Sequence, residues 1–208
     1  MRAGVRLYLA SSNPGKVAEF RAIAASGNFS DFELELLPGF SSLPQFDEDA
    51  PTFAENAAGK ALHYSRFCEG LVFSDDSGLV VPALGGAPGV RSARYAGEKA
   101  TDADRIAKLL GELGDKNGVE RRAYFICAIA LAREGRAIAV VTARADGEIL
   151  QAPRGRGGFG YDPVFYFPSL QKTFAELSTD EKNRHSHRGK AFRKLLASLQ
   201  KETRDFTK

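Results

Sequence analysis

Two adjacent carboxylates, Asp75 and Asp76, are the residues of this chain whose type and position best suit chemistry. They follow the apolar run 71–73, whose bulky and β-branched side chains indicate a buried strand, and a hydroxyl and a glycine come directly after them. Loops at strand ends are common homes for catalytic groups, because a rigid sheet holds them while they stay open to solvent. We therefore expect the two acids to lie where this strand ends.

The side chains of Asp75 and Asp76 cannot both contact one ligand while the chain is still extended. Successive residues of a strand point to opposite faces of its sheet, so the two acids share a ligand only if the strand has already ended. We expect one carboxylate to be functional and the other to be structural. The alternative is that the Asp-Asp-Ser-Gly stretch is only a turn that ends a strand.

A second candidate is the polar turn at 11–16, between a predicted strand over 5–10 and a helical pattern that starts at Val17. Unpaired N–H groups and the helix dipole favour negative charge at a helix N-terminus, and Lys16 adds a positive charge there. The turn is not a Walker A loop, because Val17 stands where Ser or Thr should follow Gly-Lys. It predicts either an anion site or only a turn and a cap.

Three consecutive acids at 47–49 follow a predicted strand over 34–37. Such a run usually forms a solvated loop, but one of its carboxylates could equally bind a hard cation, which prefers oxygen ligands. A capping box at 52–55 then predicts a helix, on which Asn56 and Lys60 are four residues apart. Both side chains can therefore lean towards the same neighbouring group.

The pattern in the middle of the chain predicts mostly helices and strands that support the fold without a role in chemistry. A capping box at 101–104 predicts another helix, and the segments 122–132 and 137–142 predict two strands joined by a turn at 134–135. The glycine-rich stretch 85–95 carries two arginines and predicts either a shaped loop close to a ligand or partner, or only a long connection.

Glycines surround two aromatic residues and an acid at 156–163, just ahead of a predicted strand over 164–167. A flat apolar face beside a hydrogen-bond acceptor is what a planar base needs, so this stretch can form a base-binding loop. The alternative is a β-turn whose aromatic side chains fill the core.

The last part of the chain carries several hydrogen-bond donors. A capping box at 178–181 and an amphipathic pattern over 192–199 predict two helices with a break between them. Lys182, His187 and Arg188 lie near that break.

Composition limits the class of protein. The 208 residues, 43% of them hydrophobic, suffice for one α/β domain or two small lobes. The net charge of +3 is uneven, because residues 171–208 carry ten Lys or Arg against five Asp or Glu. That basic run predicts a solvated helix or one wall of an anion site, and nucleic acid is a weak third choice because no groove-reading motif appears.

The expected cellular location of the protein rests on signals that the sequence lacks. Residues 1–10 show no long apolar region or cleavage site, and the longest apolar run, 123–132, is too short to span a bilayer. Cys68 and Cys127 stand in no metal-binding or redox spacing. We expect a cytoplasmic protein with reduced cysteines and no membrane or nucleic-acid partner.

Six motifs in the right order, spread over residues 11–189, resemble the inosine triphosphate pyrophosphatase family of enzymes that remove non-canonical purine nucleotides. The motifs are the segments 12–16, 52–57, 74–79, 85–89, 159–163 and 186–189. The resemblance implies an elongated α/β molecule with two lobes around a long mixed sheet, formed by residues 1–208 as one domain, with the nucleotide in the cleft between the lobes. It also implies a Mg²⁺-dependent homodimer that hydrolyses inosine, deoxyinosine and xanthosine triphosphates to the monophosphate and diphosphate.

The resemblance also assigns roles by position. It makes Asp76 the proton acceptor and a metal ligand, and Ser77 a substrate contact. The family usually shows two glutamates before a glycine where this chain has Asp47 and Glu48, so Asp47 matches the second metal ligand and Glu48 is its substitute. The triphosphate would be held by Ser11, Ser12, Asn13, Pro14, Gly15 and Lys16. The base and sugar would be enclosed by Phe159, Gly160, Tyr161, Asp162, Lys182, His187 and Arg188.

The residue types alone, without the family resemblance, are consistent with triphosphate hydrolysis. A triphosphate repels hydroxide, so a site must neutralise its charge and activate a water, for which Lys16, Lys60, Asp76 and the acidic run are suitable. The spacing does not say which phosphorus is attacked, and attack at the α-phosphorus is implied only by the resemblance. Two alternatives stay open: a pyrophosphatase for another modified nucleotide, and a nucleotide sensor without catalysis. The preferred purine, the group that excludes guanine and the dimer surface also stay open.

Overall fold

Seven strands form one sheet among the described residues, in the order β2-β1-β3-β4-β5-β6-β7. The structure is a computed structural model that describes residues 5–25, 29 and 31–205. The strands are β1 (Val5–Leu9), β2 (Phe32–Leu36), β3 (Leu71–Val80), β4 (Arg122–Arg133), β5 (Arg136–Ile149), β6 (Phe165–Phe167) and β7 (Lys172–Thr173). The α-helices are α1 (Pro14–Ala25), α2 (Phe53–Tyr64), α3 (Asp102–Leu113), α4 (Thr179–His185) and α5 (His187–Asp205).

The sheet is mixed because its connections differ in length. β1 pairs in parallel with β2 and with β3, and the chain returns to the sheet each time through a crossover that contains a helix. From β3 onward every neighbouring pair is antiparallel. β4 and β5 are joined at Glu134 and Gly135, where φ is 51° and 74°. Positive φ at both central residues is typical of a two-residue hairpin turn.

Alternate residues of β4 serve two different layers. Cys127 and Ile129 pack into the core beneath α5 with Phe192, whereas Ala128 and Ala130 face α2. β4 contributes alanines to the contact with α2, so this helix can approach the strand closely. The period of two along β4 thus lets one strand carry helices on both faces.

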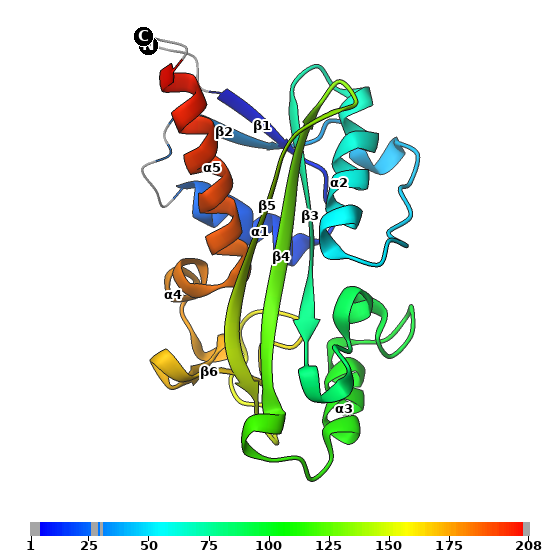
Figure 1. The fold of residues 1–208 in the computed structure, drawn as a ribbon, viewed down its shortest axis with the longest axis vertical. Helices are drawn as coiled ribbons and strands as arrows, with labels where there is room; N and C mark the ends of the chain where they lie inside the picture. Colours follow the sequence, from blue (N-terminus) through cyan, green and yellow to red (C-terminus); the bar gives the residue numbers. More distant parts are fainter. Residues whose placement is uncertain (1–4, 26–28, 30, 206–208) are drawn as a thin grey trace.

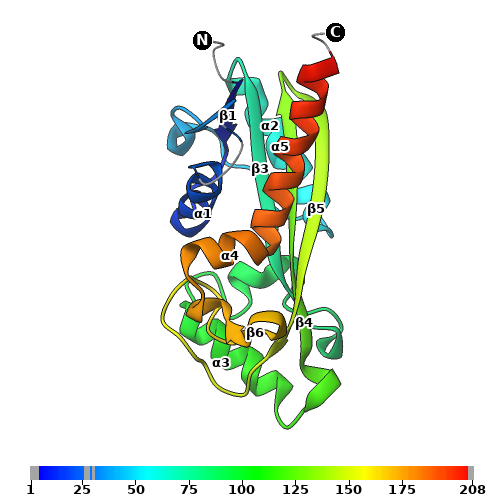
Figure 2. The same cartoon turned by 90° about the vertical axis from the view of Figure 1, so that its left-hand side faces the viewer.

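Figure 1 shows an elongated molecule in which β3, β4 and β5 run along its length. Around the upper halves of these strands lie α1, α2 and α5, with α4 at the junction below α5 (Figure 2). The lower ends of β4 and β5 enter a second hydrophobic core, shared with α3 and β6. The prediction of an elongated, two-lobed α/β molecule around a long mixed sheet is confirmed.

Most predicted elements are present, with shifted ends. The helix caps at Thr52, Thr101 and Ser178 are confirmed, each side chain accepting a hydrogen bond from the backbone N–H three residues on. The strand predicted over 34–37 lies at Phe32–Leu36, and β5 continues to Ile149 instead of ending near 142. Within the described part of the chain, no helix combines the length and apolar character that crossing a membrane requires.

One expectation about β3 is wrong. The strand does not end at the two acids but continues through them to Val80, pairing Asp75 with Ile129 and Asp76 with Ala128 on β4. Extended backbone at the acids is stabilised because β4 continues the ladder beside it. A buried charge is tolerated in a central strand only when it is paired or hydrogen-bonded, and both carboxylates are.

Candidate active site

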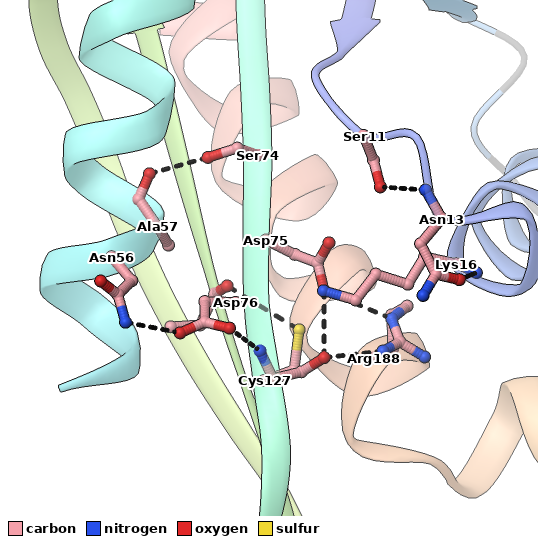
Figure 3. A network of polar contacts seen from close by, with 12 residues as sticks. Ser11, Asn13, Lys16, Asn56, Ala57, Ser74, Asp75, Asp76, Cys127 and Arg188 are labelled. Carbon is pink, nitrogen blue, oxygen red and sulfur yellow. Dashed lines mark hydrogen bonds and ion pairs between the residues drawn. The ribbon is translucent and has the colours of Figure 1, made fainter. Parts of the chain in front are cut away.

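Asp75 and Asp76 point to opposite sides of β3, as Figure 3 shows. The fully buried Asp75 faces α1 and α5, where its Oδ2 lies 2.9 Å from Lys16 Nζ and 3.5 Å from Arg188 Nε. Burial alone would raise the pKa of Asp75, but the positive charges of Lys16 and Arg188 hold that pKa below its usual range. Asp75 is therefore a permanent anion that fixes two cations.

Asp76 has the opposite environment, on the side of α2. Its Oδ2 accepts a hydrogen bond from Asn56 Nδ2 at 3.0 Å, and its Oδ1 accepts one from the backbone N–H of Ser77 at 2.9 Å. Burial raises the pKa of Asp76 to about 6, the nearby Glu48 carboxylate adds to the rise, and Lys16 opposes it. A carboxyl group with a pKa near neutrality is suited to exchange protons with a reacting group.

Asp76 borders a polar cavity of about 450 Å³. Its other lining residues include the acid Glu48 and the cations Lys16, Lys60 and Arg94. The N-terminal turn of α1 contributes Ser11, Ser12 and Asn13. A helix N-terminus and three cations beside two carboxylates form a site that can hold an anion together with a hard cation.

Glu48, and not Asp47, faces Asp76. Glu48 lines the polar cavity, whereas Asp47 is exposed and lines only an adjoining hollow, which shares Glu48 and Arg94 with that cavity. The Oε1 of Glu48 lies 2.5 Å from Lys60 Nζ. Asp47, the second metal ligand by sequence position, therefore does not line the cavity that Asp76 borders, and the alternative Glu48 does.

Lys60 is engaged with protein groups. Its ammonium donates to Glu48 Oε1 and, at 2.8 Å, to the backbone carbonyl of Asp75. Arg94 donates to the carbonyl of Glu48, also at 2.8 Å. The expectation that Lys60 and Asn56 lean towards one group is wrong: Lys60 binds Glu48 and the backbone of β3, while Asn56 binds Asp76 and Ala50.

The turn before α1 is built as the sequence predicts. Asn13 Oδ1 accepts a hydrogen bond from the backbone N–H of Lys16 at 3.1 Å, and Pro14 occupies the first helical position, where its missing N–H costs nothing. Gly15 lies against the ring of Phe159, which a Cβ at residue 15 would approach to 2.6 Å. The glycine thus lets the helix start and the 156–163 loop come into contact.

A second, smaller cavity of about 130 Å³ adjoins the polar one. The two cavities share the lining residues Asn13, Lys16, Ser77 and Ala93, so they are continuous. All seven residues that the sequence assigned to base and sugar line the smaller cavity: Phe159, Gly160, Tyr161, Asp162, Lys182, His187 and Arg188. Segments more than 150 residues apart in the chain meet here, from α1, β3, the 156–163 loop, α4 and α5.

Buried ion pairs connect the helices that form one wall of the smaller cavity. Lys182 Nζ lies 2.5 Å from Glu19 Oε1 and also pairs with Asp162. Arg188 pairs with the other oxygen of Glu19 and donates to Ser77 Oγ at 2.7 Å. These side chains are fixed by one another, so the wall is pre-organised.

His187 lines the smaller cavity and carries a buried ring nitrogen without a hydrogen-bond partner among the described residues. The side chain is buried and stacks on Phe125, with ring centroids 4.7 Å apart and an interplanar angle of 11°. Burial lowers the pKa of His187 well below 6.5, and the charges of Arg188 and Lys182 lower it further, so the imidazole is neutral. Its Nδ1 has no hydrogen-bond partner among the described residues.

The two aromatic residues of the 156–163 loop have different surroundings. Tyr161 is buried and donates its hydroxyl proton to the carbonyl of Ser92 at 2.9 Å, so it packs as a wall residue. Phe159 stays partly exposed, with Lys182 Nζ 4.9 Å from its ring centroid. Of the two rings, Phe159 is the one whose surface is open to a planar ligand.

The sequence did not single out some lining and supporting residues. Glu19 looks like one more polar residue of a helix, and its only signal is the spacing of three from Lys16. Asp102, whose Oδ2 accepts a hydrogen bond from the backbone N–H of Gly160 at 2.7 Å, was predicted only within a helix cap. Both owe their place in the site to contacts with distant segments.

Comparisons with known proteins agree in one family. A family model described as the Ham1 family matches residues 7–198. A dITP/XTP pyrophosphatase of Geobacillus kaustophilus (strain HTA426) is 53% identical over 189 residues, which cover 91% of this chain and 91% of that protein. One from Desulfotalea psychrophila (strain LSv54 / DSM 12343) is 48% identical over 193 residues, covering 92% and 83%.

Solved structures give the same result. A HAM1 protein from Coxiella burnetii has a TM-score of 0.83 at 42% identity, covering 95% of this chain and 99% of that one. The Ham1 protein of Staphylococcus aureus has a TM-score of 0.82 at 39% identity, with the same coverage.

Proposed function

The chain belongs to the Ham1 family, and we propose that it hydrolyses non-canonical purine nucleoside triphosphates such as dITP and XTP. The products are the nucleoside monophosphate and diphosphate, and the reaction keeps these nucleotides out of DNA and RNA. The family resemblance seen in the sequence is confirmed. The enzyme works in the cytoplasm as a homodimer in this proposal.

One observation carries the proposal: a small cavity with an exposed aromatic ring opens directly into a wide cavity with cations and carboxylates. A nucleotide has the same two parts, a flat base and a charged triphosphate. The shared residues Asn13, Lys16 and Ser77 would then lie at the sugar and the first phosphate. Stacking on Phe159 suits any base, because every base has a π-face.

Mg²⁺ is the proposed cofactor, and the donor set fits it. Among the described residues no group of three or more His, Cys, Asp or Glu side chains could hold a metal ion, but Asp76 and Glu48 face the same cavity. Mg²⁺ usually binds one or two carboxylates and completes its shell with water and substrate phosphates. When bound here, it would neutralise phosphate charge as a Lewis acid.

The residues of the chain supply the remaining steps. Lys16 and the turn at 11–13 hold the phosphates, and Asp76 accepts the proton of the attacking water. The water oxygen bonds to the α-phosphorus, the bond from that phosphorus to the bridging oxygen of the β-phosphate breaks, and diphosphate leaves. Lys60 orients Glu48 and also contacts the phosphates in this proposal, because two protein oxygens use only two of the three hydrogens of its ammonium and Lys60 lines the polar cavity.

Base selection is assigned to His187. A 6-oxo purine presents an acceptor where adenine presents an amino donor, and the neutral imidazole of His187, which lines the smaller cavity, has one ring N–H to donate. Arg188 is less available, because its guanidinium binds Glu19 and Ser77 and lies near Asp75. This assignment favours purines with a 6-oxo group over adenine.

The product identifies the phosphorus that is attacked. With dITP as substrate, no orthophosphate should appear until inorganic pyrophosphatase is added, which then splits each released diphosphate into two phosphates. Phosphorus NMR should show the nucleoside monophosphate as the direct product. A nucleoside diphosphate as the first product would place the attack at the γ-phosphorus and refute the proposed reaction.

A further inference from the structure

The two carboxylates of the proposed magnesium site come from different parts of the fold. Asp76 is held in the central strand β3, whereas Glu48 belongs to an irregular loop before α2. Like charges that face one cavity repel each other. This repulsion would move the loop, and Glu48 with it, away from Asp76 unless other contacts hold the loop to β3.

Asn56, in the first turn of α2, makes that connection. It is 1% exposed, and its Nδ2 donates to Asp76 Oδ2 at 3.0 Å and to the carbonyl of Ala50 at 3.3 Å. Its Oδ1 accepts a hydrogen bond from the backbone N–H of Ala50 at 2.9 Å. One buried amide thus contacts the catalytic strand and the end of the acidic loop.

We propose that Asn56 is a positioning residue that sets the separation of Asp76 and Glu48 and so tunes metal affinity. This inference rests on the proposed function, because it takes that carboxylate pair as the magnesium site. Lys60 and Arg94 also hold Glu48, but neither has a hydrogen bond to the side chain of Asp76. Lys60 ties the loop to the backbone of β3, whereas Asn56 bonds both to the loop and to the Asp76 carboxylate itself.

The chemistry of the side chain explains why an amide stands here. An amide offers two donor hydrogens and one acceptor oxygen, and all of these are used at residue 56. A carboxylate would add a third negative charge beside Asp76 and could not donate to it. An apolar side chain would leave the buried groups of Ala50 unpaired, which is costly.

The test measures metal binding directly, with Mn²⁺ alone as the probe and electron paramagnetic resonance as the readout. Removing a side chain that supports metal ligands typically weakens metal affinity by about 10–100-fold. We expect a loss of that size in Asn56→Ala. The matched control is Ser74→Ala, which removes another buried bond between β3 and α2, from Ser74 Oγ to the carbonyl of Ala57 at 2.7 Å, a bond that involves neither the acidic loop nor a carboxylate of the proposed metal site. It should bind Mn²⁺ within about twofold of the unaltered protein, since it touches no metal ligand.

Asn56→Ser provides a second variant if Asn56→Ala does not fold. Its hydroxyl is on a shorter side chain and has a single donor hydrogen, so it cannot donate to both Asp76 and the carbonyl of Ala50, and it should show the same loss. Unchanged Mn²⁺ affinity in a folded Asn56 variant would overturn the inference and leave the proposed function intact. Absence of Mn²⁺ binding in the unaltered protein would instead refute the proposed metal site, and the inference with it.

Discussion

At the scale of single residues, two neighbouring carboxylates have different chemistry because alternate faces of β3 meet different elements. Asp75 meets Lys16 and Arg188, which keep it ionised. Asp76 meets an amide and a second carboxylate, which leave it able to take up a proton near neutral pH. The expected division into one functional and one structural acid therefore has a physical cause in the fold.

Replacing Asp76 by Asn should reduce turnover on the order of 10²–10⁴-fold while the protein stays folded. The substitution keeps the volume but removes the group that accepts the proton and binds the cation. Single-turnover rates with dITP and a thermal unfolding curve check both parts.

The matched substitution Asp75→Asn should instead lower the free energy of unfolding by about 3–5 kcal/mol, because Lys16 and the buried Arg188 would lose the counter-charge of Asp75. For the Asp76 prediction, full activity in Asp76→Asn would show that another carboxylate accepts the proton of the water.

The acidic loop offers a prediction that separates two neighbouring residues. Glu48→Gln should raise the Mg²⁺ concentration needed for half-maximal activity, because it removes one of the two carboxylates that face the polar cavity. Asp47→Asn should leave that concentration unchanged, because Asp47 does not line the polar cavity. Steady-state rates at increasing Mg²⁺ measure both. An increase in that Mg²⁺ concentration in Asp47→Asn but not in Glu48→Gln would mean that the loop changes conformation when nucleotide binds.

The sequence could identify the acidic run but not its functional member. Asp47 and Glu48 are equally polar, and the side chain that faces Asp76 is determined by the path of the loop. Asn56 fixes that path at Ala50, and Arg94 fixes it from 46 residues away at Glu48. A local pattern contains no information about such distant contacts.

At the scale of elements, the wall of the smaller cavity depends on three helices that share one anion. Glu19 of α1 binds Lys182 of α4 and Arg188 of α5, and all three side chains are buried. Burial raises the pKa of Glu19, but the charges of Arg188 and Lys182 outweigh it, so the net pKa is lowered and the acid stays ionised. These ion pairs hold the three helices together close to the point where the helical conformation is interrupted between α4 and α5.

Glu19→Gln should therefore lower the free energy of unfolding by about 3–5 kcal/mol, the cost of breaking a buried ion pair from one side. Urea denaturation measures the change. Asp146→Asn is the control, because the Arg144–Asp146 pair is solvent-exposed on both sides and such pairs contribute about 0–1 kcal/mol. Similar losses in both variants would contradict a special role for Glu19.

The elements themselves were largely predictable. The caps at Thr101 and Ser178 and the turn at Glu134 and Gly135 follow from local chemistry, and the structure confirms them. The end of β3 was not predictable, because Asp75 and Asp76 look like a strand terminus until β4 is known to pair with them. Burial of charge in that strand depends on Lys16, Arg188 and Asn56, all distant in sequence.

At the scale of the whole molecule, one buried histidine should couple stability to pH. The folded-state pKa of His187 lies well below 6.5, so below pH 6.5 the unfolded chain binds a proton that the folded chain does not. The stability contributed by neutral His187 is thus present above pH 6.5 and is lost as pH falls below it. The slope reaches about 1.4 kcal/mol per pH unit for this one group.

Urea denaturation between pH 7 and pH 5 measures that slope. In His187→Gln, which does not titrate, the dependence over this interval should be reduced by the contribution of one proton. An unchanged dependence would show that His187 is protonated in the folded protein or that other groups dominate.

The long strands bring two unlike cavities together. The polar cavity lies beside α1 and α2, the smaller one lies where α4, α5 and the 156–163 loop meet, and β3 passes between them with Asp76 and Ser77. A substrate with a flat base and a charged chain would bridge the two. This arrangement favours an enzyme over a binding module, because Asp76 can exchange protons at the junction.

Specificity constants for a set of nucleoside triphosphates test the proposed function most directly. The set contains dITP, XTP, dATP, dGTP and dTTP at saturating Mg²⁺, with release of diphosphate as the readout. We predict that kcat/KM for dITP and XTP exceeds that for dATP by as much as ~10⁴-fold, because adenine leaves the polar lining of the smaller cavity unpaired. Equal constants for dITP and dATP, a preference for a pyrimidine, or binding of dITP without turnover would contradict the proposed function.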